Sequence, residues 1–442
     1  MAEYAAEDMC WSQCPEQDAM AKREDDPTAE RMFDADRQNP LPAEDYGAVR
    51  ERPSLLSSSL VGSTNRGRVV QALFDRGPSS RAELARLAGV NRTTISGIVQ
   101  PLLDQQFLVE GEPVPAGEVG GKPARPLWFS PQARPICGIL LMPEEVRSCL
   151  VSLEGKIDAE HREPLSAHPS GPAEITERLT ACVTRTLASA RRRPLGLGVA
   201  VGGMVDTNRR NIIAVNLAPV LAGYPIGEIL AGRFGLPVQI DHHPRALLVG
   251  DRWFGKGRGM RNFAVVYTGE VLGGALHLDG HLYRGVSGAG GELGHTFVQV
   301  DGDVCYCGRR GCWETIATLG WLRRRAAEAG LPEPGAIDSR RLVALAEAGR
   351  PGAAELLDNY ARNVAVGIAN LQQTVAPNFF ILHGDVVGGG KRMVDAIAAH
   401  VRRLVPSRPG GEVSFDTGDT EDRAALLGAA GLVLSDLLHF PL

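Results

Sequence analysis

Three amphipathic helices are predicted between residues 66 and 103, because apolar residues recur there at intervals of three and four positions. The first covers 66–75. The second begins after Ser80-Arg81-Ala82-Glu83, which has the form of a capping box. The third begins after Asn91, a favoured N-cap residue, and carries an apolar stripe along one face. That stripe consists of Ile95, Ile98, Val99, Leu102 and Leu103.

Two short strands are predicted directly after these helices, at 106–110 and 127–129, with a loop rich in Gly and Pro between them. Helix, helix, turn, helix and a two-stranded wing are the order of a winged helix-turn-helix. We therefore expect this domain at 61–132.

The pattern changes beyond residue 133 to short apolar runs that alternate with helical segments, which predicts an α/β domain. Its length of just over 300 residues predicts two lobes within 133–442. The runs that we interpret as strands are 195–201, 238–240, 263–267 and 379–382.

Composition places the chain among globular proteins, with 44% hydrophobic and 22% charged residues and a net charge of −5. Residues 1–60 contain many acids and prolines and few large aliphatic residues, so we expect this segment to be disordered. The N-terminus lacks the pattern of a secretory signal, and the apolar stretch 424–435 is too short to cross a bilayer. These features predict a cytoplasmic protein without a membrane partner.

A local basic excess points to double-stranded DNA, since residues 63–100 hold six arginines against two acids. The second helix of a helix-turn-helix reads the major groove with its N-terminal residues, and dimers read paired half-sites. We therefore expect a homodimer or homotetramer on a DNA operator. A module for protein contacts is the alternative reading. The candidate DNA-binding residues are Ser80, Arg81, Asn91, Arg92, Thr93, Thr94 and Ser96 on the helices, and Gly121, Lys122 and Arg125 on the wing.

Three cysteines crowd into one short segment, as Cys305, Cys307 and Cys312, ten residues after His295. Three thiolates and one imidazole are a ligand set of closed tetrahedral zinc sites. The loop 295–312 is therefore predicted to bind a structural Zn²⁺.

Two motifs resemble those of the ROK family of repressors and sugar kinases. They are Gly-Ala-Gly-Gly-Glu-Leu-Gly-His at 288–295 and Cys-Tyr-Cys-Gly-Arg-Arg-Gly-Cys-Trp-Glu at 305–314. The resemblance covers roughly residues 63–442. It implies a two-lobed actin-like ATPase fold, and the N-terminal winged helix resembles the branch of xylose, glucose and N-acetylglucosamine repressors.

The resemblance also implies a sugar or sugar-derivative effector, bound by Glu292, His295 and Glu314, with Asn216 in the entry loop. His242 and His243 stand where the family has an Asn and an Asp that contact sugar hydroxyls. Two readings follow: protonated imidazoles bind an anionic sugar derivative, or the pocket has drifted and binds nothing.

Phosphoryl transfer needs a phosphate cradle and a base for the attacking hydroxyl. By resemblance, Leu140, Met142 and Val271 replace residues of the phosphate loops, and His243 replaces the catalytic Asp. We expect a DNA-binding transcriptional regulator, taken as a repressor, without kinase activity. The alternatives are a sugar kinase with an appended DNA-binding domain and an effector-blind regulator controlled by a protein partner.

Overall fold

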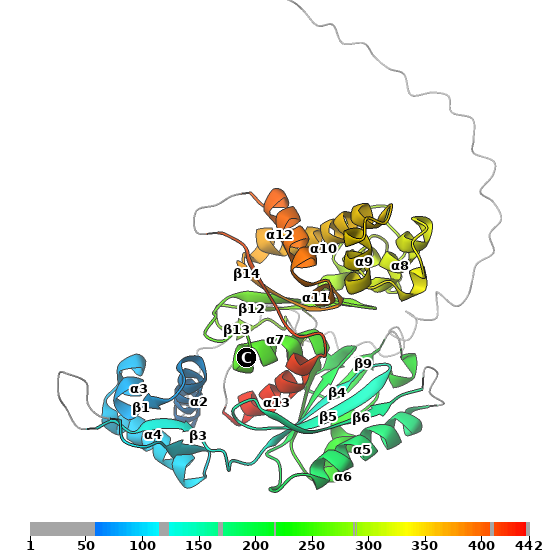
Figure 1. The fold of residues 1–442 in the computed structure, drawn as a ribbon. Helices are drawn as coiled ribbons and strands as arrows, with labels where there is room; N and C mark the ends of the chain where they lie inside the picture. The colour runs from blue at the N-terminus through cyan, green and yellow to red at the C-terminus, as the bar shows by residue number, and fades with distance from the viewer. Residues whose placement is uncertain are drawn as a thin grey trace, which may run out of the picture. The chain divides into compact units, whose positions relative to one another are not determined.

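The computed structural model describes residues 58–114, 123–166, 171–215, 218–285, 288, 290–406 and 411–438, which belong to one compact unit (Figure 1). Most of the acidic segment 1–60 lies outside these residues. Its last three residues were expected to be disordered, yet they form the first turn of helix α2.

The N-terminal elements have the order expected of a winged helix-turn-helix. They are α2 (Ser58–Arg76), β1 (Ser79–Ser80), α3 (Arg81–Ala88), α4 (Arg92–Asp104), β2 (Leu108–Glu110) and β3 (Pro126–Phe129). The strands form one antiparallel sheet in the order β1-β3-β2. Strand β2 is shorter than predicted because Gln106 has a φ of 56°, which no strand accommodates. Strand β1 has two residues, too few for a periodic signal.

Both predicted helix starts are confirmed by their caps. The Ser80 hydroxyl accepts a hydrogen bond from the Glu83 amide, and the Glu83 carboxylate accepts one from the Ser80 amide at 2.7 Å. The Asn91 side chain accepts a hydrogen bond from the Thr94 amide at 2.8 Å. These bonds satisfy amides that the first turn of a helix leaves without partners.

The remaining chain forms two α/β lobes, as predicted, each built on a five-stranded sheet. The first sheet has the order β10-β7-β4-β5-β6, from Val238–His242, Leu197–Val201, Ile136–Leu141, Glu145–Val151 and Ile157–Pro164. The second has the order β13-β12-β11-β14-β15, from His281–Leu282, Leu272–Leu278, Phe263–Thr268, Phe379–Gly384 and Ser414–Thr417. A small hairpin, β8 (Met204–Asp206) and β9 (Asn211–Ala214), lies beside the first sheet.

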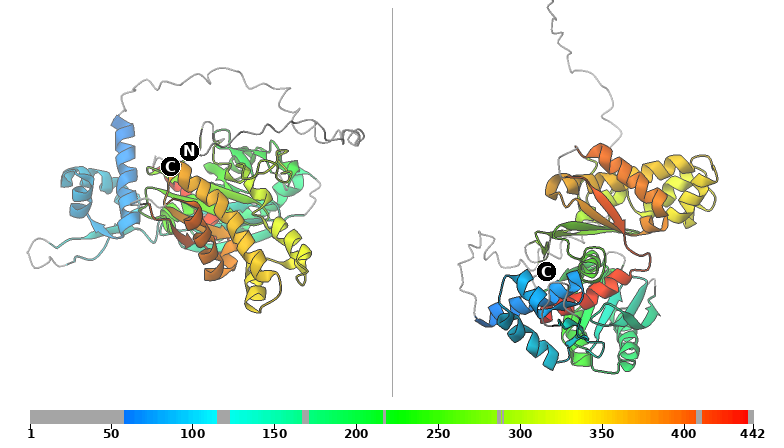
Figure 2. Two further views of the ribbon diagram at one scale, coloured as in Figure 1. Left: turned by 90° about the horizontal axis from the view of Figure 1, so that it is seen from above. Right: turned by 60° about the vertical axis from the view of Figure 1, so that its left-hand side comes forward.

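Helices cover the outer faces of both sheets, and two helices lie between the sheets (Figures 1 and 2). Helices α5 (Pro172–Ala188) and α6 (Ile226–Phe234) share a core with the first sheet. The second sheet packs against α8 (Leu319–Glu328), α9 (Ser339–Glu347), α10 (Ala353–Val375), α11 (Asp385–Gly388) and α12 (Gly390–Leu404). The central pair is α7 (His243–Phe254) and α13 (Arg423–Leu437).

Glycines allow α7 and α13 to pack backbone against backbone. A Cβ atom on Gly428 would lie 1.7 Å from the carbonyl oxygen of Ala246, and one on Gly250 would lie 2.0 Å from that of Ala424. Any side chain at either position would force the two helices apart. The pair therefore forms a rigid element between the lobes.

Helix α2 packs against the C-terminal end of α7. The Phe74 ring lies 4.8 Å from the ring of Trp253 and 5.5 Å from that of Phe254. The Asp75 carboxylate accepts hydrogen bonds from both terminal nitrogens of Arg252, at 2.7 and 3.3 Å. The Gly259 amide donates a further bond to Asp75 at 3.0 Å. The N-terminal domain is thus attached to the lobe by both apolar and ionic contacts.

Within the part of the chain that the structure describes, we find no helix whose length and hydropathy would let it cross a membrane.

Candidate functional site

A cleft of about 480 Å³ opens between the lobes and gathers residues from distant parts of the chain. His242 and His243 reach it from the junction of β10 with α7, while Glu292 and His295 reach it from the loop after β13. Four of the six predicted effector residues therefore line one cleft. Asn216 lies outside the described residues.

The sixth predicted effector residue, Glu314, does not line the cleft, because it is buried behind Tyr306 and the cysteine loop. Its carboxylate accepts hydrogen bonds from the Cys305 thiol at 3.0 Å and from the Tyr306 hydroxyl at 3.1 Å. The Tyr306 ring lines the cleft in its place, a residue that the sequence analysis did not select. We therefore assign Glu314 a structural role, in which it holds Cys305 and Tyr306 in the wall of the cleft.

His242 faces Glu292 across the cleft, with 3.9 Å between its Nδ1 atom and a carboxylate oxygen. Burial, together with the nearby Arg245 guanidinium, lowers the pKa of His242 to about 3, so its imidazole is neutral near pH 7. Burial and Arg245 therefore oppose the protonated His242 that an anionic ligand would favour. By contrast, burial raises the pKa of the Glu292 carboxyl. A neutral imidazole and a carboxyl group can both form hydrogen bonds with the neutral hydroxyls of a ligand.

Arg245 fixes the glycine-rich loop that precedes Glu292. The guanidinium donates to the carbonyl oxygens of Gly288 and Gly290 at 2.6 and 2.5 Å, and it pairs with the fully buried Asp241 at 3.1 Å. Arg284 contacts the other oxygen of Asp241 at 2.9 Å. One carboxylate thus joins two arginines and anchors the loop of the cleft. We call these contacts of Arg245, Asp241 and Arg284 the clasp; they were not predicted from the sequence.

We expect Arg245→Ala to lower the free energy of unfolding by about 3 kcal/mol, because it removes one partner of a buried ion pair and two loop bonds. The exposed pair of Arg323 with Glu270 offers the control. Arg323→Ala should cost less than about 1 kcal/mol, since solvent screens that pair. Urea unfolding of both variants measures the difference, and equal losses would contradict the role of the clasp.

His295 and the three predicted cysteines form a compact cluster. One ligand atom from each of His295, Cys305, Cys307 and Cys312 lies within 4.8 Å of all the others. The pairs Cys307–Cys312 and His295–Cys305 are separated by 3.7 and 3.6 Å. Tetrahedral zinc with a Zn–S distance of about 2.3 Å would place its ligands about 3.7 Å apart. The cluster thus has the donors and the spacing to hold a metal ion.

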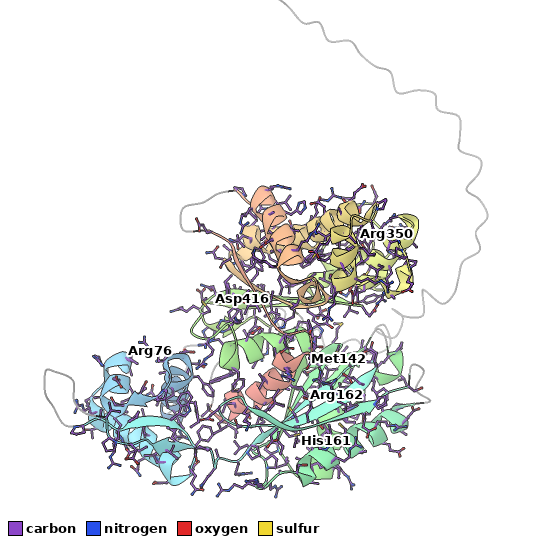
Figure 3. All side chains as sticks on the ribbon, in the orientation of Figure 1. Arg76, Met142, His161, Arg162, Arg350 and Asp416 are labelled. Atoms are coloured by element: carbon purple, nitrogen blue, oxygen red, sulfur yellow. The ribbon has the colours of Figure 1, made fainter. Side chains whose placement is uncertain are left out.

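Charged residues also line the cleft. Glu144, Glu270 and Asp385 line the cleft together with Arg323 and Arg340, and Met142 lies in the turn that joins β4 to β5 (Figure 3). Leu140 is buried in the core and offers no group to a ligand. The Arg323 guanidinium pairs with Glu270 at 2.7 Å, so this carboxylate has its counter-charge within the cleft.

His243 occupies the position predicted for a lost catalytic base and is almost fully buried. Its Nε2 atom lies 3.5 Å from an oxygen of Asp422, and its ring meets the edge of Tyr267 at 4.7 Å. Burial acts to raise the pKa of Asp422, but His243 lowers it, and the net shift is downward. The pair therefore joins the first residue of α7 to the residue that precedes α13.

The predicted DNA-binding residues divide into exposed and structural groups. Arg92, Thr93 and Thr94 are exposed on the first turn of α4, and Ser96 is half-buried. Ser80 is buried in its cap, and Arg81 pairs with Glu110. Asn91 is exposed but caps α4. On the wing, Arg125 is exposed, whereas Gly121 and Lys122 lie outside the described residues.

Two α/β lobes around a polar cleft, preceded by a winged helix, are the architecture of the chain, and a fold of this kind does not by itself fix the activity. The chain belongs to the ROK family, which residues 138–436 match. It is 26% identical over 404 residues to a putative xylose repressor of Caldicellulosiruptor sp., covering 87% of this chain and 98% of that protein. It is also 28% identical over 307 residues to a glucokinase of Streptomyces coelicolor, covering 65% and 94% of the two chains.

A solved structure supports the fold over nearly the whole chain. A ROK family transcriptional regulator, described as a homologue of the Escherichia coli MLC protein, matches with a TM-score of 0.70 and 22% identity. The match covers 86% of this chain and 99% of that structure. The relatives therefore include both repressors and kinases, and the distinction rests on the residues of this chain.

Proposed function

We propose that this protein is a DNA-binding transcriptional repressor whose kinase-like cleft binds a neutral sugar and no longer transfers phosphate. The proposal rests on the first turn of α4, which is exposed and carries Arg92. The chain that contains it is similar to xylose repressors over 98% of their length. Its expected partners are a double-stranded operator and a sugar effector.

DNA recognition would begin at the N-terminus of α4. Arg92 lies at the first position of the helix with its side chain exposed, beside Thr93 and Thr94. An arginine in the major groove can contact O6 and N7 of guanine together, and hydroxyls suit phosphates or base edges. Arg125, on the wing, would contact the DNA backbone.

We expect Arg92→Ala to weaken operator binding by about 1–3 kcal/mol and to relax base preference at one position of each half-site. The control is Arg350→Ala, which removes the same charge from an exposed site between α9 and α10 in the second lobe (Figure 3). Fluorescence anisotropy with labelled operator, over a range of salt concentrations, measures both. An equal loss of affinity for all DNA sequences would instead show that Arg92 contacts a phosphate and not a base.

The ligand chemistry of the cleft favours an uncharged pentose or hexose. His242 is neutral and Glu292 lies opposite it, so donors and acceptors face the cleft without a surplus of positive charge. His295 would contribute one ring nitrogen to the metal and turn its other nitrogen toward Tyr306, 3.3 Å away. Zn²⁺ is the metal that the Cys₃His donor set fits best, and its role would be structural.

Helix α7 would transmit effector binding to the DNA-binding domain. Its first residue, His243, lies at the cleft, and Arg252 and Trp253 near its other end contact α2. A change in lobe angle that moves the rigid pair of α7 and α13 must therefore also move α2. Thermodynamic coupling of this kind commonly amounts to about 1–3 kcal/mol.

The proposal is tested by capturing genomic duplexes with the purified full-length protein, in the presence and absence of single sugars. The panel holds xylose, glucose, N-acetylglucosamine and the phosphates of glucose. Enrichment of a palindromic site that one neutral sugar releases is the expected result. Release by a sugar phosphate alone would overturn the neutral ligand, and absence of any enriched site would overturn the repressor.

A sugar kinase remains the second candidate, because glucokinases are among the relatives and His243 stands beside Asp422 where a base would act. By resemblance, Leu140, Met142 and Val271 stand where kinases of the family have phosphate-loop residues, which argues against it. ATP consumption with a panel of hexoses tests this candidate. Turnover that His243→Ala abolishes would establish it.

A further inference from the structure

The winged helix contains two adjoining cavities that the proposed function does not use. The larger, of about 310 Å³, lies between α2 and the pair of α3 and α4, and the smaller, of about 250 Å³, lies between α2 and α3. Arg68, Ala72 and Leu87 line both cavities, so the two adjoin. We call them together the α2 groove.

The larger cavity has mostly apolar walls. Val69, Leu84, Leu87, Val90 and Ile95 are among the residues that line it. Two of them, Leu87 and Val90, remain 42 and 40% exposed. Covering exposed apolar surface is favourable, and a cavity of this volume lies at the lower end of the range of small-molecule sites. The larger cavity therefore suits the apolar part of a small ligand.

The smaller cavity adds positive charge and a hydrogen-bond acceptor to the same groove. Arg68 and Arg76 are exposed, and neither has a carboxylate partner among the residues that the structure describes. Gln71 also lines this cavity but is only 6% exposed. Its Nε2 atom donates to Asp75 at 2.8 Å, while its buried Oε1 atom accepts no hydrogen bond from any described residue. A buried acceptor without a donor is costly, so a ligand that donates to Gln71 would be stabilised.

Asp75 lines the smaller cavity as well, and an unpaired carboxylate there would repel an anion. Its charge is matched by Arg252, 2.7 Å away, so Arg68 and Arg76 give the groove a positive excess. Guanidinium groups form strong hydrogen bonds with carboxylates. The groove therefore fits a ligand that combines a carboxylate with an apolar body. A sugar, which we propose for the cleft between the lobes, has no apolar part for the larger cavity.

We propose that the α2 groove binds a small apolar acid with a donor group on the carbon next to its carboxylate, that is, a 2-amino or 2-hydroxy acid. The apolar side chain would occupy the larger cavity. The carboxylate would pair with Arg68, and the amino or hydroxyl group would donate to Gln71. Thr94, on the first turn of α4, lines one cavity, and Asp75, at the contact with α7, lines the other. An effect of the ligand on the operator would rest on the proposed function.

The test is isothermal titration calorimetry of the full-length protein without DNA or sugar, so it stays valid if the proposed repressor function fails. The probes are L-leucine, L-phenylalanine and 2-hydroxy-4-methylpentanoate, which also distinguish an amino from a hydroxyl donor. The matched compounds are 4-methylpentanoate, which lacks the donor, and 3-methylbutylamine, which lacks the carboxylate. At least one probe is expected to bind once per chain, with both matched compounds at least about tenfold weaker.

Three variants locate the binding site. Arg68→Ala should raise the dissociation constant about tenfold, because it removes the partner of the carboxylate. Ala72→Phe should abolish binding by filling the junction of the cavities, and circular dichroism checks that it folds. Arg86→Ala is the control, an exposed arginine of α3 that lines neither cavity. No binding of any probe, equal binding of 4-methylpentanoate, or native affinity in Arg68→Ala would overturn the proposal.

Discussion

Cys312→Ser is expected to abolish metal binding by the Cys₃His cluster and to lower the free energy of unfolding by several kcal/mol. Cys312 is fully buried, and its thiol lies 3.7 Å from that of Cys307. Burial raises the pKa of the Cys305 and Cys312 thiols, so their thiolate forms need a cation beside them. We therefore expect metal binding to contribute most of the free energy that holds the loop.

The consequences should extend to the cleft, because the Cys305 thiol and the Tyr306 hydroxyl both contact Glu314. We expect the variant to lose sugar-dependent release from the operator as well. Metal analysis, chemical denaturation and operator binding measure the three effects. Cys182→Ser is the matched control, a buried cysteine outside the cluster that should keep one metal per chain. Full metal content in Cys312→Ser would contradict the predicted ligand set.

The two lobes could be predicted because strands such as β7 and β14 consist mostly of apolar residues that are buried on both faces. Strand β5 was missed because Arg147 interrupts its apolar run. That arginine is 3% exposed and pairs with Glu160 on the neighbouring strand at 2.7 Å. Sequence periodicity assigns a charged residue to the surface, and only the neighbouring strand reveals its partner.

The metal ligands could also be predicted, because they lie within eighteen residues and chemistry fixes their type. The clasp of Arg245 could not, since its carbonyl partners lie 43 and 45 residues away and any residue can supply a carbonyl. The same holds for Asp75 and Arg252, which are 177 residues apart. Local patterns therefore identified the ligands of the site but not the contacts that position and connect it.

Asp75→Asn is expected to uncouple the operator from the effector. The substitution keeps the shape of the side chain but leaves Arg252, which is 8% exposed, without its counter-charge. Loss of one partner from a buried pair costs about 3 kcal/mol. Since this pair fastens α2 to α7, the variant should bind operator DNA while its affinity no longer changes with sugar. The ratio of dissociation constants with and without sugar should fall toward one.

Arg252→Gln breaks the same pair from the other side, so the double variant should lose little more than either single variant. Asp416→Asn is the control, because its exposed pair with Lys256 lies outside the α2–α7 contact (Figure 3). Anisotropy titrations with and without sugar measure the ratio for all four variants. An unchanged ratio in Asp75→Asn, together with a normal ratio in Arg252→Gln, would show that the signal bypasses α7. In that case the lobes would reach the DNA-binding domain through another contact, and the hydrogen bond from Arg192 to Gln106, at 2.9 Å, would be the next to remove.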